Sequence, residues 1–79
     1  MWREKIREIL AEHAFIRQES INDLMTLRGD LMMDSLRFAN CIVEVEKQLK
    51  LKLPMDVYEL SDTITVGDLF ELLEPYYGV

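Results

Sequence analysis

The chain has 79 residues, 49% of them hydrophobic, with only three glycines and two prolines. This composition is typical of one small folded domain with a thin core, and it argues against a disordered tail. Fifteen acidic and nine basic residues give a net charge of −6, so we expect no nucleic acid partner. The single cysteine, Cys41, excludes an internal disulfide and a cysteine-rich zinc site, and it fits a reducing, cytoplasmic location.

The charge is unevenly distributed along the chain. Residues 54–79 carry six acidic residues and no basic one, whereas residues 35–53 carry four basic and two acidic residues. The middle segment is therefore the only locally basic part. No apolar run approaches the ~18 residues of a membrane span, and residues 1–10 are charged and amphipathic, so we expect neither a span nor a signal peptide.

The first third of the chain predicts a helix followed by a long connection. The helix should begin at Trp2 and continue to about residues 13–16, because apolar residues recur with the helical period at Trp2, Ile6, Ile9 and Leu10. The connection, residues 18–34, is too apolar for a polar linker, and loops of this length are often functional. Its apolar residues are Ile21, Leu24, Met25, Leu27, Leu31, Met32 and Met33, and the leucines and the isoleucine suggest that it folds over the core and is pinned there.

The rest of the chain predicts a second helix, an extended exit and a last helix. Residues 35–49 have the clearest helical pattern, with apolar residues at Phe38, Cys41, Ile42, Val45 and Leu49. Residues 50–53 should leave that helix in an extended conformation before Pro54, and residues 55–62 could form one or two turns. Thr65 is a good N-cap, Asp68 completes a variant of the capping box, and Pro75 should end the last helix. The predicted fold class is all-α: a single domain, residues 1–79, with three main helices and one short helix in a small antiparallel bundle with a long first loop.

Catalysis finds no support in the sequence. The only histidine, His13, lies in the first helix, and Ser35 sits in no nucleophile elbow. The carboxylates match neither a paired acid–base arrangement nor a calcium loop, so we predict no enzyme and no metal site. Arg28–Asp30 spells a tripeptide that resembles a cell-adhesion signal, but a polar turn explains it.

Ser35 admits two interpretations. As a serine at a helix start it could simply be an N-cap. However, the segment "DLMMDSL" (residues 30–36), the helix after it, the "LKLKLP" exit and "TITVGDLFELLE" near the end together resemble the acyl carrier protein family. In that family a serine in an Asp-Ser-Leu motif at the start of the second helix carries a 4′-phosphopantetheine arm. The motif matches Asp34, Ser35 and Leu36.

The resemblance implies a cofactor site and a set of partners. Ser35 would be the attachment residue, with Asp34 beside it, and acyl or related groups would be held as thioesters on the arm. The implied partners are a phosphopantetheinyl transferase, an acyl-loading ligase or transferase, and synthase-type enzymes, with the carrier itself a monomer. The start of a helix is also a favourable place for the arm's phosphodiester, because a helix N-terminus has unpaired N–H groups and the positive end of the helix dipole.

The chain also departs from the family pattern. Met32 and Met33 replace residues that are usually small, and they could fill the core or provide an adaptable contact surface. The second helix lacks the strong acidity of fatty-acid carriers, which predicts dedicated partner enzymes in a specialised pathway. Leu36 could be an exposed contact or an ordinary core leucine. The candidate partner-binding residues are Leu36, Arg37, Asn40, Val43, Glu46 and Lys47.

Two other functions stay open from the sequence. The chain could be an unmodified helical protein-interaction module with the carrier fold, or a small DNA-binding helical domain, which its acidity opposes. The cargo is also open between acyl, aminoacyl and polyketide intermediates. If the helices open to shelter a short acyl chain, the lining candidates are Ile42, Val45, Leu49 and Leu69.

Overall fold

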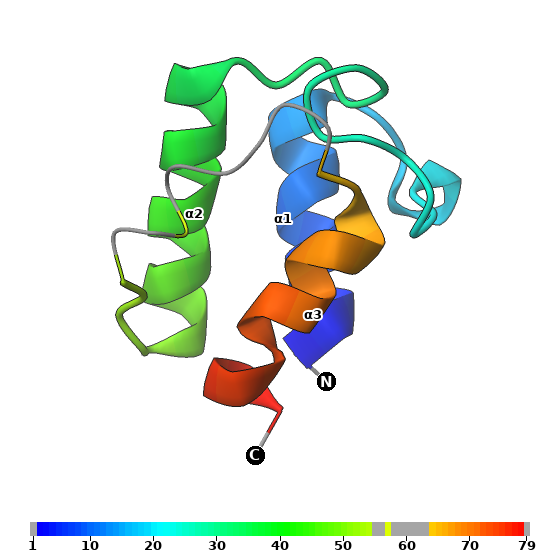
Figure 1. Cartoon of the computed structure of the whole chain (residues 1–79). Coiled ribbons are helices and arrows are strands. Elements are labelled where there is room, and N and C mark those ends of the chain that lie inside the picture. The colour runs from blue at the N-terminus through cyan, green and yellow to red at the C-terminus, as the bar shows by residue number, and fades with distance from the viewer. Residues whose placement is uncertain (1, 55–56, 58–63, 79) are drawn as a thin grey trace.

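The computed structural model describes residues 2–54, 57 and 64–78, and these form a helical bundle. Its elements are α1 (Trp2–Ala14), the 3-10 helix η1 (Gln18–Ser20), α2 (Ser35–Leu49) and α3 (Val66–Tyr77). Figure 1 shows that α1 runs opposite to α2 and α3, so that α1 begins and α3 ends at one end of the bundle and α2 begins at the other. The all-α prediction is confirmed, and the antiparallel relation holds between α1 and each of the other two helices. No α-helix in the described part of the chain is long and apolar enough to cross a membrane.

The core lies where one apolar stripe from each helix meets the other two. These stripes repeat every three or four residues, as the sequence pattern predicts, because that spacing returns side chains to one helix face. The buried residues are Ile6, Ile9, Leu10 and Ala11 of α1, Phe38, Cys41, Ile42 and Val45 of α2, and Val66, Leu69, Phe70 and Leu73 of α3. Helix packing therefore leaves the opposite face of α2 to solvent.

The connection between α1 and α2 is pinned over the core, as predicted, but only by some of its apolar residues. Ile21, Leu27, Leu31 and Met33 are buried. Leu24 is 86% exposed, so the prediction that it also pins the loop is wrong. Met32 is 77% exposed as well. Main-chain hydrogen bonds, both within the loop and to the segment before α3, fix its path, and this path leaves the two side chains exposed.

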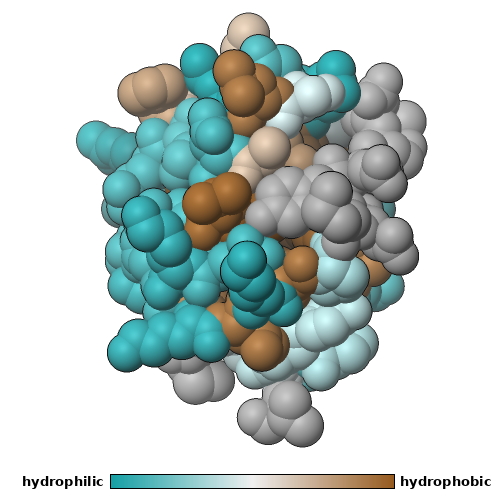
Figure 2. Space-filling view, turned by 90° about the vertical axis from the view of Figure 1, so that its left-hand side faces the viewer, coloured by the Kyte–Doolittle hydropathy of each residue, from teal (hydrophilic) through white to brown (hydrophobic). Residues whose placement is uncertain are grey.

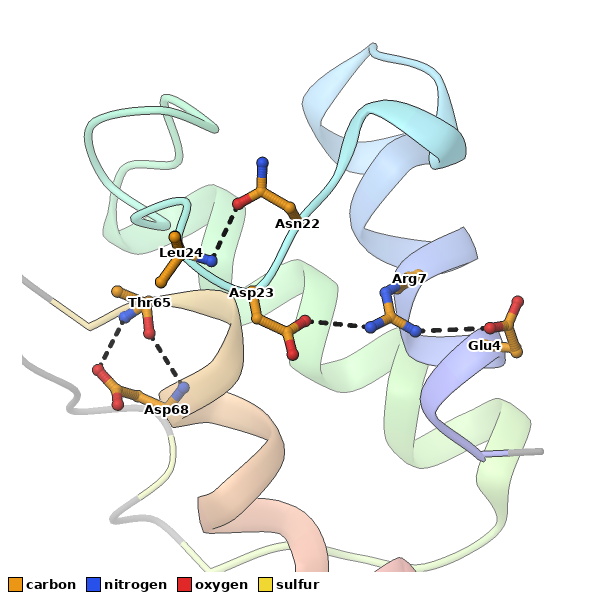
Figure 3. A network of polar contacts seen from close by, with 7 residues as sticks. All are labelled: Glu4, Arg7, Asn22, Asp23, Leu24, Thr65 and Asp68. Carbon is orange, nitrogen blue, oxygen red and sulfur yellow. Dashed lines mark hydrogen bonds and ion pairs between the residues drawn. The ribbon is translucent and has the colours of Figure 1, made fainter.

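Those main-chain hydrogen bonds join the connection to the segment that leads into α3. The N–H of Leu27 donates to the carbonyl of Ile64 at 3.0 Å, and the N–H of Val66 donates to the carbonyl of Met25 at 2.8 Å. Neither this pairing nor η1 was predicted from the sequence. Figure 3 shows a further tie to α1, in which Arg7 contacts Asp23 at 3.0 Å.

The Arg28–Asp30 tripeptide lies in a tight turn, as its polar composition predicts. The N–H of Thr26 donates to Asp30 Oδ2 at 2.9 Å, and the N–H of Asp30 donates back to Thr26 Oγ1 at 3.0 Å. Gly29 is needed because a Cβ at that position would lie 2.7 Å from Thr26 Oγ1. This turn holds Arg28 in a defined place near the start of α2.

The start of α3 agrees with the prediction and its end does not. Thr65 and Asp68 form the capping box in both directions, with each hydrogen bond at 3.1 Å (Figure 3). Pro75 was expected to end the helix, but α3 continues to Tyr77. Proline removes one N–H in the last turn, and tertiary contacts compensate: Tyr77 donates its hydroxyl to the carbonyl of Leu51 at 3.0 Å, and its ring lies 6.0 Å from that of Trp2.

The exit from α2 is extended, as predicted, and is closed by one acidic residue. Lys50 takes the left-handed conformation, with φ 57°, and its N–H donates to the carbonyl of Glu46. The Glu46 carboxylate then accepts from the N–H of Leu53 at 2.6 Å. The short helical segment expected at residues 55–62 lies outside the described residues, apart from Val57, which is buried.

Candidate cofactor attachment site

The start of α2 separates the residue that caps the helix from the serine that follows it. Asp34 is the N-cap, with an extended backbone, and its Oδ1 accepts a hydrogen bond from the N–H of Arg37 at 2.7 Å. Ser35 is the first residue of the helix itself. The interpretation of Ser35 as an N-cap is therefore wrong, because Asp34 already supplies that hydrogen bond.

The hydroxyl of Ser35 is exposed at this helix end and has a cation beside it. Arg28 Nη2 donates to Ser35 Oγ at 3.3 Å, across a separation of seven residues. The helix N-terminus adds unpaired N–H groups and the positive end of the helix dipole. Arg28 was missed as a site residue, because no local signal in the sequence relates a loop arginine to a serine that lies beyond a turn.

These residues fit the phosphodiester of a phosphopantetheine arm. The group is anionic, and both the helix N-terminus and the Arg28 guanidinium favour an anion at Ser35 Oγ. The neighbouring Asp34 carboxylate accepts the capping hydrogen bond from the N–H of Arg37. An exposed hydroxyl also leaves space for a transferase to approach.

The neighbours of Ser35 differ in burial. Met33 is buried in the core, whereas Met32 has φ 55° and faces solvent. Core filling is therefore confirmed for Met33 and wrong for Met32, and a contact role for Met32 stays a prediction. Leu36 is 71% exposed, so its interpretation as a core leucine is wrong.

The candidate partner-binding residues share the outer side of α2. Figure 2 looks onto the side of the molecule that carries α2 and shows hydrophobic atoms interrupted by hydrophilic side chains. Leu36, Arg37, Asn40, Val43 and Lys47 are all exposed there. Glu46 differs, since its carboxylate is turned to the backbone of the helix exit.

A surface groove of about 440 Å³ lies between the end of α1 and the start of α2. Arg37 places its guanidinium 5.3 Å from the ring centre of Phe15, an exposed residue that was not anticipated. The groove is lined by Glu12, His13, Phe15, Asp34, Leu36, Arg37 and Asn40. His13 thus lies near the serine end of α2, but within the described part of the chain it forms no hydrogen bond with Ser35.

The chain's own thiol is unsuited to carrying an acyl group. Cys41 is fully buried, and this burial, with a smaller contribution from Glu44, raises its pKa from 9.0 to about 12. It therefore stays protonated and unreactive near neutral pH. Of the expected acyl-lining residues, Ile42, Val45 and Leu69 are buried in the core and Leu49 packs against it. The described residues contain no group of three side chains that could hold a metal ion.

Comparison with known proteins identifies the family. Residues 4–73 match the family model described as "Phosphopantetheine attachment site". The chain is 29% identical to the acyl carrier protein of Clostridium perfringens over 70 residues, which cover 89% of this chain and 90% of that protein. It is 33% identical to the acyl carrier protein of Saccharopolyspora erythraea over 69 residues, which cover 87% of this chain and 70% of that protein. With a family model that spans most of its length, the chain belongs to the acyl carrier protein family, whose cofactor is 4′-phosphopantetheine.

Proposed function

We propose that Ser35 is the residue to which the arm is attached, and that the chain serves as a carrier of acyl or related intermediates in a specialised pathway. The observation that supports this most directly is the position of Ser35 Oγ, which is exposed at the N-terminus of α2 beside Arg28. Asp34 accepts the capping hydrogen bond, so the hydroxyl of Ser35 is not needed as the N-cap. Cys41 is a free, buried cysteine, which supports a reducing, cytoplasmic location.

Three residues divide the work at this site. Ser35 provides the oxygen that forms the phosphodiester, and Asp34 fixes the helix start that presents it. Arg28, whose guanidinium donates to Ser35 Oγ, would stabilise the charged group once it is attached. When attached, the arm supplies the thiol on which acyl groups are held as thioesters. The protein's part is to present that arm to docked enzymes at high effective concentration.

The surface around the site supports dedicated partners over general fatty-acid enzymes. Leu36 is an exposed apolar residue next to Ser35, and the exposed Arg37 adds a positive charge beside it. Electrostatic complementarity mainly sets encounter rate and partner choice. Enzymes that select carriers by a basic patch should therefore use this chain poorly, and its loading ligase and synthase-type partners should be matched to it.

Intact mass spectrometry tests the attachment residue. The purified chain is incubated with coenzyme A and a phosphopantetheinyl transferase, alongside Ser35→Ala, Arg28→Ala and, as the matched control, Ser20→Ala. We expect one phosphopantetheine adduct on the wild type and on Ser20→Ala, none on Ser35→Ala, and slower formation on Arg28→Ala. An adduct that persists in Ser35→Ala would move the site elsewhere. Failure of several transferases to modify the folded wild type would support the unmodified interaction module.

A further inference from the structure

A second groove lies at the far end of α2 from Ser35. It has a volume of about 460 Å³ and is lined by Val43, Glu46, Lys47, Lys50, Leu51 and Lys52. Val43 is 45% exposed and Leu51 is 41% exposed, so both offer apolar surface to the groove. Figure 2 shows hydrophobic atoms between hydrophilic side chains toward this lower end of the α2 side. The helix rises ~1.5 Å per residue, so Lys50 lies roughly 22 Å from Ser35 along α2.

The lysines of this groove differ from the basic residues of α1. Arg3, Lys5 and Arg7 each form an ion pair with a carboxylate of the same chain. Within the described part of the chain, no ion pair is formed by the three groove lysines, Lys47, Lys50 and Lys52. The one acidic residue in the lining, Glu46, uses its carboxylate to accept from the N–H of Leu53. The groove therefore combines two exposed aliphatic side chains with three cations in a chain of net charge −6.

The backbone at Lys50 is unusual for a lysine. Lys50 takes the left-handed conformation, with φ 57° and ψ 41°, at the C-cap of α2. Glycine or asparagine meets that geometry with less strain. A lysine gains some compensation from the negative end of the helix dipole, and it also keeps a positive charge at the mouth of the groove.

We propose that this groove docks an acidic segment of a partner protein, with an aliphatic side chain of that segment between Val43 and Leu51 and its carboxylates on the three lysines. The inference rests on the proposed carrier function, since it names the chemistry of a partner. Burial of the aliphatic pair supplies affinity, and the lysines supply encounter rate and selectivity. The position of the groove leaves the Ser35 end of α2 open while the partner is bound.

An acidic protein segment fits better than the other anionic surfaces. Lysine-rich segments that bind anionic membranes usually contain four to eight basic residues, and this groove has three. A membrane or a nucleic acid is a large anionic surface, and the chain's net charge of −6 would repel it. A short acidic segment contacts only the locally basic part.

The proposal is tested by NMR titration of the isotope-labelled chain with two synthetic amphipathic peptides. Both have the same length and the same leucine positions, and their charged positions are all glutamate in one and all lysine in the other. We expect amide shifts confined to residues 43–52 with the glutamate peptide, no comparable shifts with the lysine peptide, and at least tenfold weaker binding in high salt. Equal binding of the two peptides, or shifts centred on the Ser35 end, would overturn the proposal.

Two charge variants and a control sharpen the titration. Lys47→Glu combined with Lys52→Glu should weaken the glutamate peptide at least tenfold. Lys50→Gly removes a charge and relieves the left-handed backbone, so it should weaken binding severalfold without lowering the thermal midpoint. Lys5→Gln removes a cation that is already paired with Glu8, so it should change neither the peptide affinity nor the thermal midpoint. If the glutamate peptide bound the Lys47→Glu, Lys52→Glu variant and Lys50→Gly as tightly as the wild type, the proposed groove would be refuted.

The same samples address the competing occupants. Binding to vesicles of anionic phospholipid at 0.15 M salt, lost in the lysine variants, would assign the groove to a membrane surface instead. Self-association that depends on these lysines would assign it to a second copy of the chain. The titration uses the chain without cofactor, so the two proposals can fail separately. Missing peptide shifts would overturn the groove but not the attachment of the arm to Ser35. A missing mass adduct would overturn the attachment but would not explain missing peptide shifts.

Discussion

Replacing Asp34 and Ser35 by alanine, one at a time, separates the residue that holds α2 from the residue proposed to carry the cofactor. The two are adjacent in sequence and both are exposed, yet only Asp34 accepts the hydrogen bond from the N–H of Arg37. The structure therefore predicts opposite outcomes. Asp34→Ala should destabilise the fold, and Ser35→Ala should leave it intact while abolishing modification.

The magnitudes follow from the local contacts. Loss of an N-cap costs about 1 kcal/mol, and removing a negative charge from a helix N-terminus adds roughly 0.5 kcal/mol. Asp34→Ala should thus lower the free energy of unfolding by ~1.5 kcal/mol, or the thermal midpoint by roughly 6–12 °C for a domain of this size. Ser35→Ala loses an exposed hydrogen bond from Arg28 but gains helix propensity, so its change should stay within about 0.5 kcal/mol.

Urea unfolding followed by circular dichroism measures both variants against the wild type. Asp34→Asn is the matched control, because it keeps an acceptor for the capping hydrogen bond and removes only the charge, so it should lose less stability than Asp34→Ala. If Ser35→Ala were the more destabilised variant, the serine would be the structural residue, and the division of roles argued here would be refuted.

Two further predictions concern groups away from the serine. Because burial raises the pKa of Cys41 from 9.0 to about 12, its thiol should react with a disulfide reagent at pH 8 roughly 10³-fold more slowly in the folded chain than in urea. The thiol ionises at lower pH in the unfolded chain than in the folded chain, so the free energy of unfolding should fall as the pH rises above 9.0. Cys41→Ala should remove that part of the fall. A variant with the same pH profile as the wild type would contradict this prediction. Tyr77→Phe should cost about 1 kcal/mol, measured by thermal unfolding, because it removes the hydroxyl that donates to the Leu51 carbonyl. Tyr76→Phe on the same turn is the control and should change little; equal losses would mean that the hydrogen bond does not hold the end of α3.

Much of the fold could be predicted because its signals are local. The apolar stripes of the three helices, the capping box of Thr65 and Asp68, and the turn at Arg28–Asp30 each depend on residues within a few positions of one another. The end of α3 could not be predicted in this way. Pro75 is a local stop signal, and it is overridden by contacts from Tyr77 to Trp2 and Leu51, which are distant in sequence.

The burial of the connection shows the same limit. Its apolar residues predicted a loop held against the core, but nothing in their type distinguishes buried Leu27 and Met33 from exposed Leu24 and Met32. That choice is made by backbone hydrogen bonds to the segment before α3. A loop has no fixed period, so the pattern of residue types cannot say which side chains face inward.

The sequence by itself determined that this is a small helical domain, where its helices lie, and that one serine follows an aspartate at the start of the second. Motif order and spacing also determined the family, since these survive in the order of residues along the chain. Only the tertiary structure decided that Asp34 and not Ser35 caps α2, that Arg28 stands beside the serine, and that three lysines surround two exposed aliphatic residues at the other end of the helix. Those facts depend on which side chains meet in space, and that is set by the packing of the whole chain.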